Sequence, residues 1–311
     1  PINFDNDTDG IYAEVLRIVE LWISRGVKIF RVDNPHTKPL DFWQWLIGRV
    51  NEKHPEVIFL AEAFTRPAMM HGLGKAGFQQ SYTYFTWRNS TQELKAYLTE
   101  VAYESSNFFR PNFWPTTPDI LPEYLQYGGR GGHKIRAAIA ATAVPSWGMY
   151  AGYELVESVA RTGVEEHVDS EKYEYKPRDF DAAEKAGTSL APYVTKLNEI
   201  RNAHPALAQL RNIEFHSSDD GAILVYSKHL DGEHTQNGKP DTVIVVVNTD
   251  PHAVRETMVT LDLWKLGLPD NAVFDVTDLI TGETWNWGTR NYVRLDPAVE
   301  PVHILRVNRK K

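Results

Sequence analysis

Apolar residues in the first two thirds of the chain alternate between two periodicities. Residues 15–23 place apolar side chains at the spacing of one helix face, and a short apolar run at 27–32 follows. The same succession returns as a helix pattern at 41–53 and an apolar run at 57–60. Further helices are predicted at residues 91–104, 134–143 and 190–203. Because helices alternate with short apolar strands, we expect βα units and a parallel sheet covered on both faces.

From about residue 212 the pattern changes to short strands separated by turn signals such as Thr281-Gly282 and Asp296-Pro297. The predicted strands cover residues 222–228, 242–247, 257–263, 273–278, 283–287, 292–295 and 302–307. Such closely spaced short strands indicate an antiparallel β-sandwich. We therefore predict two domains, an α/β part at 1–211 and a sandwich at 212–311.

Two successive predicted strands of the α/β part end in a carboxylate. Arg31 and Asp33 share one face of the first strand, and Glu62 ends the second. Taken singly, Arg31 and Asp33 could be a structural ion pair, and Glu62 could be a helix cap or loop residue. In a parallel α/β barrel, however, the carboxyl ends of the strands meet at one rim, where active sites lie. We therefore expect Asp33 and Glu62 to face each other.

A third acid, Asp119, follows the strand-like start at 112–114 and a proline-rich turn. Alone it could simply cap the next helix. Two facing carboxylates suit glycosidic chemistry, in which one is the general acid and base and the other attacks the anomeric carbon or assists a water. A third acid would hold sugar hydroxyls. The many aromatic residues of the α/β part could stack on sugar rings, although an aromatic core explains most of them.

Composition excludes several classes of partner and of chemistry. The 311 residues carry a net charge of −8, with a sequence pI near 5.8, which argues against nucleic acid or an anionic membrane as a partner. There is no cysteine, so disulfides, thiolate metal sites and a cysteine nucleophile are excluded. This is consistent with the cytoplasm, where we expect the protein. No apolar run approaches the ~20 residues of a membrane span.

We expect neither a cofactor nor a catalytic metal. No helical His-x-x-x-His pair occurs among the histidines, and no Gly-x-Ser-x-Gly elbow is present. The glycine-rich stretch at 128–132 lacks the spacing of a phosphate-binding loop. We predict instead that it forms a flexible turn before a helix that begins at Lys134.

The three acids and their neighbours resemble a known family. Arg31-Val32-Asp33, Glu62 and Asp119 are similar to conserved regions two, three and four of the α-amylase family, glycoside hydrolase family 13. The flanking residues resemble one subgroup more closely, the α-1,4-glucan:maltose-1-phosphate maltosyltransferases. The stretches that carry this likeness are Phe30-Arg31-Val32-Asp33-Asn34-Pro35-His36, Leu60-Ala61-Glu62-Ala63-Phe64 and Thr117-Pro118-Asp119-Ile120-Leu121.

The resemblance implies a fold and a mechanism. The chain would be the C-terminal part, about strands 4–8, of a (β/α)8 TIM barrel followed by an antiparallel β-sandwich domain. Asp33 would be the nucleophile of a retaining transfer from α-maltose 1-phosphate to an α-1,4-glucan, with Glu62 as general acid and base and Asp119 as the third acid. The resemblance also implies a homodimer. It places substrate contacts at Arg31, Asn34, Lys172 and Tyr173.

Two features set the chain apart from ordinary amylases. Pro118 stands where most amylases have a histidine before the third acid, which is typical of the transferase subgroup. The family's first conserved region is absent, so we expect the first barrel strands to lie outside these residues. Two alternatives therefore remain open: an amylase-type hydrolase that uses water as the acceptor, and a non-catalytic glucan-binding chain.

Overall fold

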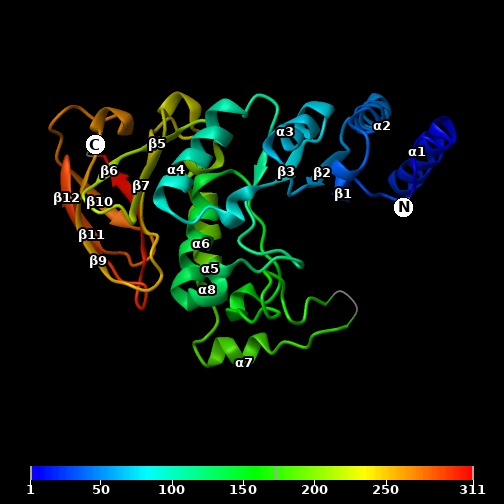
Figure 1. The fold of residues 1–311 in the computed structure, drawn as a ribbon. Coiled ribbons are helices and arrows are strands. Elements are labelled where there is room, and N and C mark those ends of the chain that lie inside the picture. The colour runs from blue at the N-terminus through cyan, green and yellow to red at the C-terminus, as the bar shows by residue number, and fades with distance from the viewer. Residues whose placement is uncertain (1, 172–173, 310–311) are drawn as a thin grey trace. The chain divides into compact units, whose positions relative to one another are not determined.

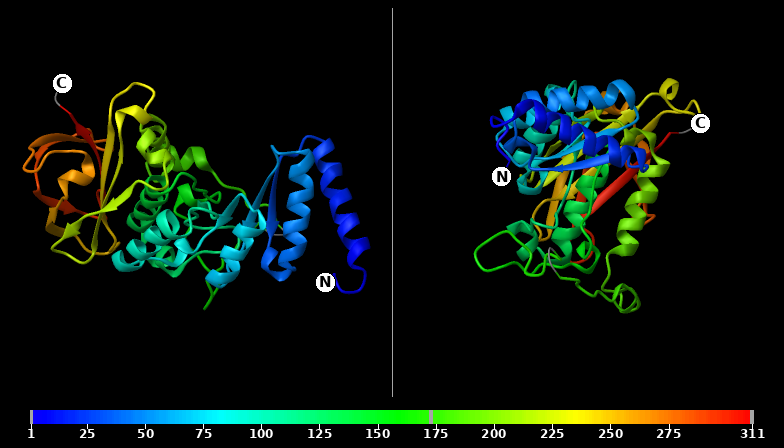
Figure 2. Two further views of the ribbon diagram at one scale, coloured as in Figure 1. Left: turned by 90° about the horizontal axis from the view of Figure 1, so that it is seen from above. Right: turned by 90° about the vertical axis from the view of Figure 1, so that its right-hand side faces the viewer.

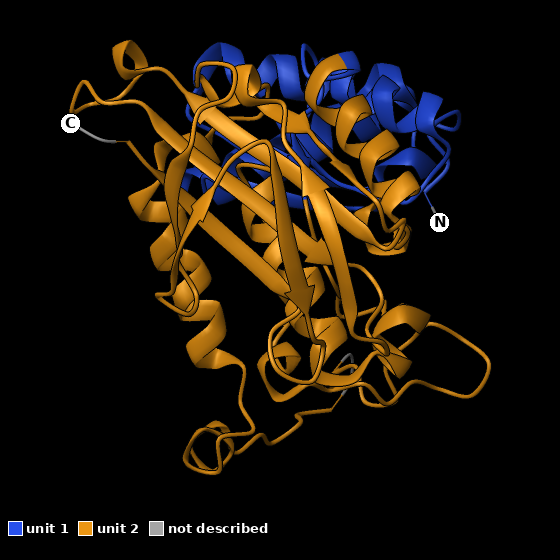
Figure 3. Ribbon diagram, turned by 90° about the vertical axis from the view of Figure 1, so that its left-hand side faces the viewer, with its two compact units in different colours: residues 1–84, 104–112 blue, residues 85–103, 113–311 orange. Residues whose placement is uncertain are grey.

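The computed structural model describes residues 2–171 and 174–309. The chain forms two compact units (Figure 3). The first unit comprises residues 1–84 and 104–112, and the second comprises residues 85–103 and 113–311. The predicted division into domains at 1–211 and 212–311 stays a prediction.

The first unit contains a parallel sheet with the strand order β1-β2-β3-β4 (Figure 1). Its strands are β1 (Ile29–Asp33), β2 (Ile58–Glu62), β3 (Gln80–Tyr82) and β4 (Pro111–Asn112). The apolar runs at 27–32 and 57–60 correctly predicted β1 and β2. In contrast, β3 was not predicted, because three residues are too few for an alternating pattern.

Three helices pack on the sheet of the first unit: α1 (Thr8–Ser24), α2 (Leu40–Lys53) and α3 (Pro67–Ala76). Helices α1 and α2 lie side by side in both views of Figure 2. Phe59 and Ala61 of β2 are buried in the same core cluster as Phe42 and Leu46 of α2. The opposite sheet face, on which Arg31 and Asp33 lie, carries Ile29 with 58% of its surface exposed. This one-sided burial suits a segment of a barrel wall, whose second face would line the barrel interior.

The second unit contains the remaining helices. They are α4 (Thr91–Thr99), α5 (Glu123–Tyr127), α6 (Gly129–Ala143), α7 (Phe180–Lys185) and α8 (Ala191–Ala203). Helix α4 begins with a capping box, in which Ser90 and Glu93 bond to each other's backbone N–H groups. It continues as a π-helical turn over Glu100–Glu104, so the predicted helix at 91–104 changes its hydrogen-bonding pattern partway. A parallel bridge between Phe113 and Trp147 is the next parallel pairing along the chain after β4.

The expectation for the glycine-rich stretch was wrong. Residues 129–132 form the first turn of α6, which begins at Gly129 rather than at Lys134. A Cβ atom on Gly131 would lie 2.9 Å from the carbonyl oxygen of Pro297. Close packing against the segment around Pro297 therefore requires glycine at this point of the helix, a reason that the local sequence does not reveal.

The C-terminal strands form two antiparallel sheets, as predicted. The larger sheet has the order β11-β10-β13-β8-β7-β5 and the smaller one β12-β9-β6. The strands are β5 (Ile213–Phe215), β6 (Ser217–Ser218), β7 (Ile223–Leu230), β8 (Asp241–Asn248), β9 (Arg255–Thr260), β10 (Phe274–Asp278), β11 (Thr284–Trp287), β12 (Arg290–Leu295) and β13 (Val302–Asn308). Residues from both sheets, including Val246 and Val293, pack in one buried cluster between them. No helix among the described residues is long and apolar enough to cross a membrane.

Candidate active site

Polar side chains form a row across the carboxyl ends of the parallel strands. Asp33 is the direct partner of Glu62 in the register of β1 and β2. The register of β2 with β3 pairs Leu60 with Gln80, so Tyr82 comes next to Glu62. Tyr82 in turn pairs with Asn112 of β4. The parallel hydrogen-bonding pattern thus aligns four polar strand ends at one edge of the sheet of the first unit.

The two acids of this row have different environments. Glu62 is only 5% exposed, whereas the side chain of Asp33 is 69% exposed. Burial raises the pKa of the Glu62 carboxyl above its usual value, and the neighbouring Asp33 carboxylate raises it as well. The backbone N–H of Asn34 and the charge of Arg31 oppose this rise. The net direction favours a protonated Glu62.

Arg31 lies between the two acids. Its guanidinium nitrogens are 3.4 Å from Oδ1 of Asp33 and 3.5 Å from Oε2 of Glu62. The guanidinium also lies over the ring of Tyr82, 5.9 Å from the ring centroid. Arg31 can therefore fix the orientation of both carboxylates at once, because a planar guanidinium presents several donors in one rigid fork.

Asn34 directly follows Asp33, and its backbone has a conformation that few residues adopt. Its backbone has φ 44° and ψ 52°, in the left-handed region, immediately before Pro35. This turn points the Asn34 N–H at Glu62, with 3.3 Å to Oε2, and the side-chain amide donates to Oδ1 of Asp33 at 3.1 Å. Asparagine tolerates this conformation better than most residues, so one residue donates a hydrogen bond to each acid.

The sequence did not reveal the part that Tyr82 and Asn112 take in this row. Both side chains are buried, with 8% and 7% of their surface exposed. Burial raises the pKa of the Tyr82 hydroxyl, although its hydrogen bond to Arg31 acts in the opposite direction. Only the strand register identifies them, because neither residue belongs to an apolar run that ends in an acid.

Asp119, the third predicted acid, lies in the second unit. It sits in an exposed turn closed by hydrogen bonds between the backbones of Thr117 and Ile120. Glu165 anchors this turn from a distant part of the chain. Its backbone carbonyl accepts from the N–H of Leu121, and its carboxylate accepts from the indole N–H of Trp87 at 2.7 Å. The sequence did not single out Glu165, since it lies in a long polar loop without a motif.

Of the predicted substrate contacts, Lys172 and Tyr173 lie outside the described residues. The loop on both sides of them carries a dense ionic cluster. Arg178, whose side chain is 5% exposed, lies 2.7 Å from a carboxylate oxygen of Glu157 and 2.7 Å from one of Glu171. Tyr150 donates to Glu171 at 2.9 Å. These contacts tie the loop together although it contains almost no regular structure.

The described residues contain no group of three or more His, Asp or Glu side chains that could hold a metal ion. The polar row itself offers two carboxyl groups, a guanidinium and amide donors. A buried carboxyl group with a raised pKa can donate a proton, and an exposed carboxylate beside it can attack an electrophilic carbon.

Comparison with known proteins points to the same family as the motifs. Residues 215–307 match the family model described as GLGE, C-terminal. The chain is 53% identical to an α-1,4-glucan:maltose-1-phosphate maltosyltransferase of Arcanobacterium haemolyticum, and 52% identical to maltosyltransferase 2 of Streptomyces coelicolor. Each match covers 99% of this chain and 45% of the relative. The chain thus spans about half the length of these relatives.

Solved structures show the same fold at low sequence identity. An α-amylase from Geobacillus thermoleovorans, solved with acarbose, has a TM-score of 0.71 and 15% identity, covering 100% of this chain and 66% of the amylase. The γ-CGTase from Alkalophilic bacillus clarkii has a TM-score of 0.66 and 17% identity, covering 94% of this chain and 42% of that protein. These likenesses show the fold, and the maltosyltransferase relatives with the motifs around Asp33, Glu62 and Asp119 show that the chain belongs to the α-amylase family, glycoside hydrolase family 13.

Proposed function

We propose that this chain carries the catalytic carboxylates of a retaining glycosyltransferase. It would move a maltosyl group from α-maltose 1-phosphate to the non-reducing end of an α-1,4-glucan. The observation that carries the proposal is the direct pairing of Asp33 with Glu62 in neighbouring strands. The two relatives named above bear names with this donor and this acceptor.

The spacing of the two acids favours retention of anomeric configuration. Asp33 and Glu62 are paired on neighbouring strands, whose backbones lie ~4.8 Å apart, and the guanidinium of Arg31 contacts both carboxyl groups. Retaining enzymes hold their two carboxyl groups about 5–5.5 Å apart, whereas inverting enzymes leave about 6.5–9.5 Å for a water. The adjacent strand positions of the two acids and their shared contact with Arg31 are consistent with the closer of these arrangements, and so support a covalent intermediate on one of the acids.

The exposure of Asp33 and the raised pKa of Glu62 support the roles proposed here for the first step. Asp33, exposed and oriented by Arg31 and Asn34, attacks the anomeric carbon of the donor. The bond from that carbon to the phosphate oxygen breaks, and phosphate leaves. Glu62 provides the proton for the leaving oxygen, because burial raises its pKa and so favours the protonated form. The product is a maltosyl ester of Asp33.

In the second step the 4-hydroxyl of the glucan end attacks the same carbon. Glu62 takes the hydroxyl proton, the ester bond breaks and the Asp33 carboxylate is restored. Asp119 would bind sugar hydroxyls and stabilise the positive charge that develops on the ring. Phosphate contacts at Lys172 and Tyr173 belong to the same proposal, as do the homodimer and the cytoplasmic location.

The test is a product analysis by mass spectrometry. The protein is incubated with α-maltose 1-phosphate and a short maltooligosaccharide. We expect a ladder that grows by two glucose units, with phosphate released. Asp33→Ala should abolish the ladder, while Asp9→Ala, an exposed acid on α1, should leave it intact. A ladder that persists in Asp33→Ala would refute the assigned nucleophile.

The same spectrum separates the alternatives. Shortened glucan with new reducing ends and no use of the phosphorylated donor would indicate a hydrolase. Untouched glucan that nevertheless binds to the protein, in Asp33→Ala and Glu62→Ala variants as well, would indicate a non-catalytic glucan-binding chain.

A further inference from the structure

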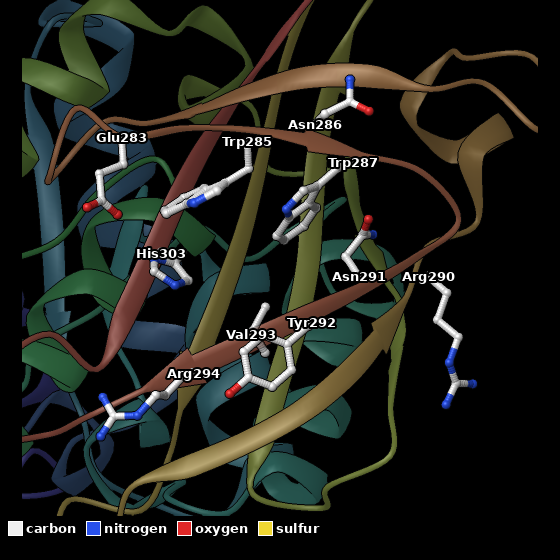
Figure 4. Close-up of a pocket in the computed structure, with 10 residues that line it drawn as sticks. All are labelled: Glu283, Trp285, Asn286, Trp287, Arg290, Asn291, Tyr292, Val293, Arg294 and His303. Atoms are coloured by element: carbon white, nitrogen blue, oxygen red, sulfur yellow. The ribbon is translucent and has the colours of Figure 1, made fainter.

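A pocket of about 530 Å³ lies at the edge of the β-sandwich, where the two sheets part (Figure 4). Strand β11 is the last strand of the larger sheet and β12 is the last strand of the smaller one. Only Gly288 and Thr289 separate them along the chain, so the pocket lies between two consecutive edge strands. We call it the β11–β12 pocket. Its volume falls within the range of about 300–1,000 Å³ typical of ligand sites.

Aromatic rings line the β11–β12 pocket from both strands. Trp285 and Trp287 point from β11 toward β12, and Tyr292 lies on β12 (Figure 4). Trp287 is buried in the sandwich core, whereas Trp285 is half-buried and Tyr292 is 58% exposed. The half-buried ring of Trp285 and the exposed ring of Tyr292 both present apolar surface in one pocket, which indicates a ligand with apolar faces.

Polar groups of fixed orientation accompany the rings. Nδ1 of His303 lies 2.8 Å from Oδ2 of Asp278, whose side chain is fully buried. The contact between Nδ1 and Asp278 fixes the ring, so that Nε2 is the nitrogen left to meet a ligand. The imidazole also packs edge-on against Trp285, with 5.2 Å between ring centroids. The His303 imidazole thus lies beside the ring of Trp285, and its hydrogen bond to Asp278 restricts its rotation.

The charges of the β11–β12 pocket argue against an anionic ligand. Glu283 brings a carboxylate to the lining. The two lining arginines already have acidic partners: Arg294 contacts Glu256 at 3.0 Å, and Arg290 contacts Asp219 at 2.5 Å. A ligand with apolar faces and neutral hydroxyl groups matches this lining, because pyranose rings stack on aromatic side chains and their hydroxyls bond to carboxylate and imidazole.

We propose that the β11–β12 pocket binds a segment of α-1,4-glucan as a second sugar site, on residues different from the catalytic ones. This rests on the proposed function, since the glucan is the acceptor in that reaction. A glucan held by the sandwich stays on the protein between transfers, which raises its effective concentration at any second site that the same chain can reach.

The test is affinity electrophoresis in native gels that contain amylose. The wild-type chain should be retarded. Trp285→Ala and Tyr292→Ala should each weaken binding by about tenfold, because central aromatic residues dominate such sites. Tyr292 is largely exposed, so its variant should fold normally even if Trp285→Ala does not. Trp264→Ala is the matched control, since Trp264 is 69% exposed in the same sandwich and lies outside the pocket.

Three results would overturn the inference. They are no retardation of the wild-type chain, retardation of Trp285→Ala and Tyr292→Ala equal to that of the wild-type chain, and retardation that requires Glu62 rather than Trp285. Equal retardation by dextran, whose linkages are α-1,6, would also refute an α-1,4-glucan site. The gel contains no phosphorylated donor, so these results leave the transferase proposal untouched. Failure of the maltosyl ladder together with retardation that depends on Trp285 would instead reject the transferase and keep the pocket.

Discussion

Lys228 provides a sharp test of the electrostatics of the second unit. This lysine of β7 is fully buried, and its ammonium group donates to the backbone carbonyls of Ala143, the last residue of α6, and Gln209. No carboxylate is among these partners. Burial, and then the charge of Arg201, lowers the pKa of Lys228 from 10.5 to about 7. The perturbation is Lys228→Met, which keeps a long, unbranched side chain and removes the charge.

The sign of the effect follows from proton binding. Between pH 7 and pH 10.5 the unfolded chain holds a proton on Lys228 that the folded chain has lost. The free energy of unfolding therefore rises with pH in this window, by up to 1.36 kcal/mol per pH unit. Integrated from pH 7 to pH 9 with the two pKa values, the gain is about 2 kcal/mol. Below pH 7 Lys228 is protonated in both the folded and the unfolded chain. Lys228 then no longer makes the free energy of unfolding depend on pH.

The assay is urea unfolding of wild type and Lys228→Met at pH 7 and pH 9, followed by circular dichroism. Loss of the bonds to Ala143 and Gln209 costs the variant the same free energy at both pH values. The difference between variant and wild type should therefore favour the variant by about 2 kcal/mol more at pH 7 than at pH 9. Taking this difference cancels the titration of all other groups.

Lys265→Met is the matched control. Lys265 also donates to a backbone carbonyl, that of Phe215, but it is partly exposed and lies near the carboxylates of Glu214 and Asp262. Its variant should differ from wild type equally at both pH values. A Lys228→Met difference that does not change between pH 7 and pH 9 would refute the reasoning, because it would mean that burial does not discharge this lysine.

Three further predictions concern the loops and the acids. Asn34→Ala should lower the free energy of unfolding by about 1 kcal/mol relative to Asn34→Gly, because alanine is strained at φ 44°; equal melting temperatures would contradict this. Arg178→Met should lower the free energy of unfolding by about 2 kcal/mol, since it removes the charged hydrogen bonds to Glu171 and Glu157 and leaves only Lys176 beside Glu157, and the loss measured by urea unfolding should shrink at low pH. Burial raises the pKa of Glu62, so the folded state holds its proton longer than the unfolded state, and stability falls as pH rises between the two pKa values. Glu62→Gln should therefore gain stability over wild type from pH 4 to pH 7 in thermal melts while losing transfer activity, and an unchanged difference would refute the buried acid.

The sequence by itself determined the succession of elements and the acids at the strand ends. Hydrophobic periodicity records which face of a helix or strand is buried, so α2, β1, β2 and the strands β7 to β13 could be predicted directly. The short strands β5 and β6 were not predicted. The positions of Asp33 and Glu62 at the ends of apolar runs were visible for the same reason. Their kinship with the α-amylase family followed from the same short motifs.

The tertiary structure decided what those residues can do. The strand register pairs Asp33 with Glu62 and adds Tyr82 to the row, because hydrogen-bond ladders join segments that are distant in sequence. The two acids differ in burial, since Glu62 is buried and Asp33 is exposed. The residue pattern of a single strand does not show whether neighbouring segments will cover the end of that strand. The same holds for Gly131 of α6, where the close approach of Pro297 leaves no room for a Cβ atom. Local sequence sets the preference of each segment, whereas contacts between distant segments set its register, its burial and hence its chemistry.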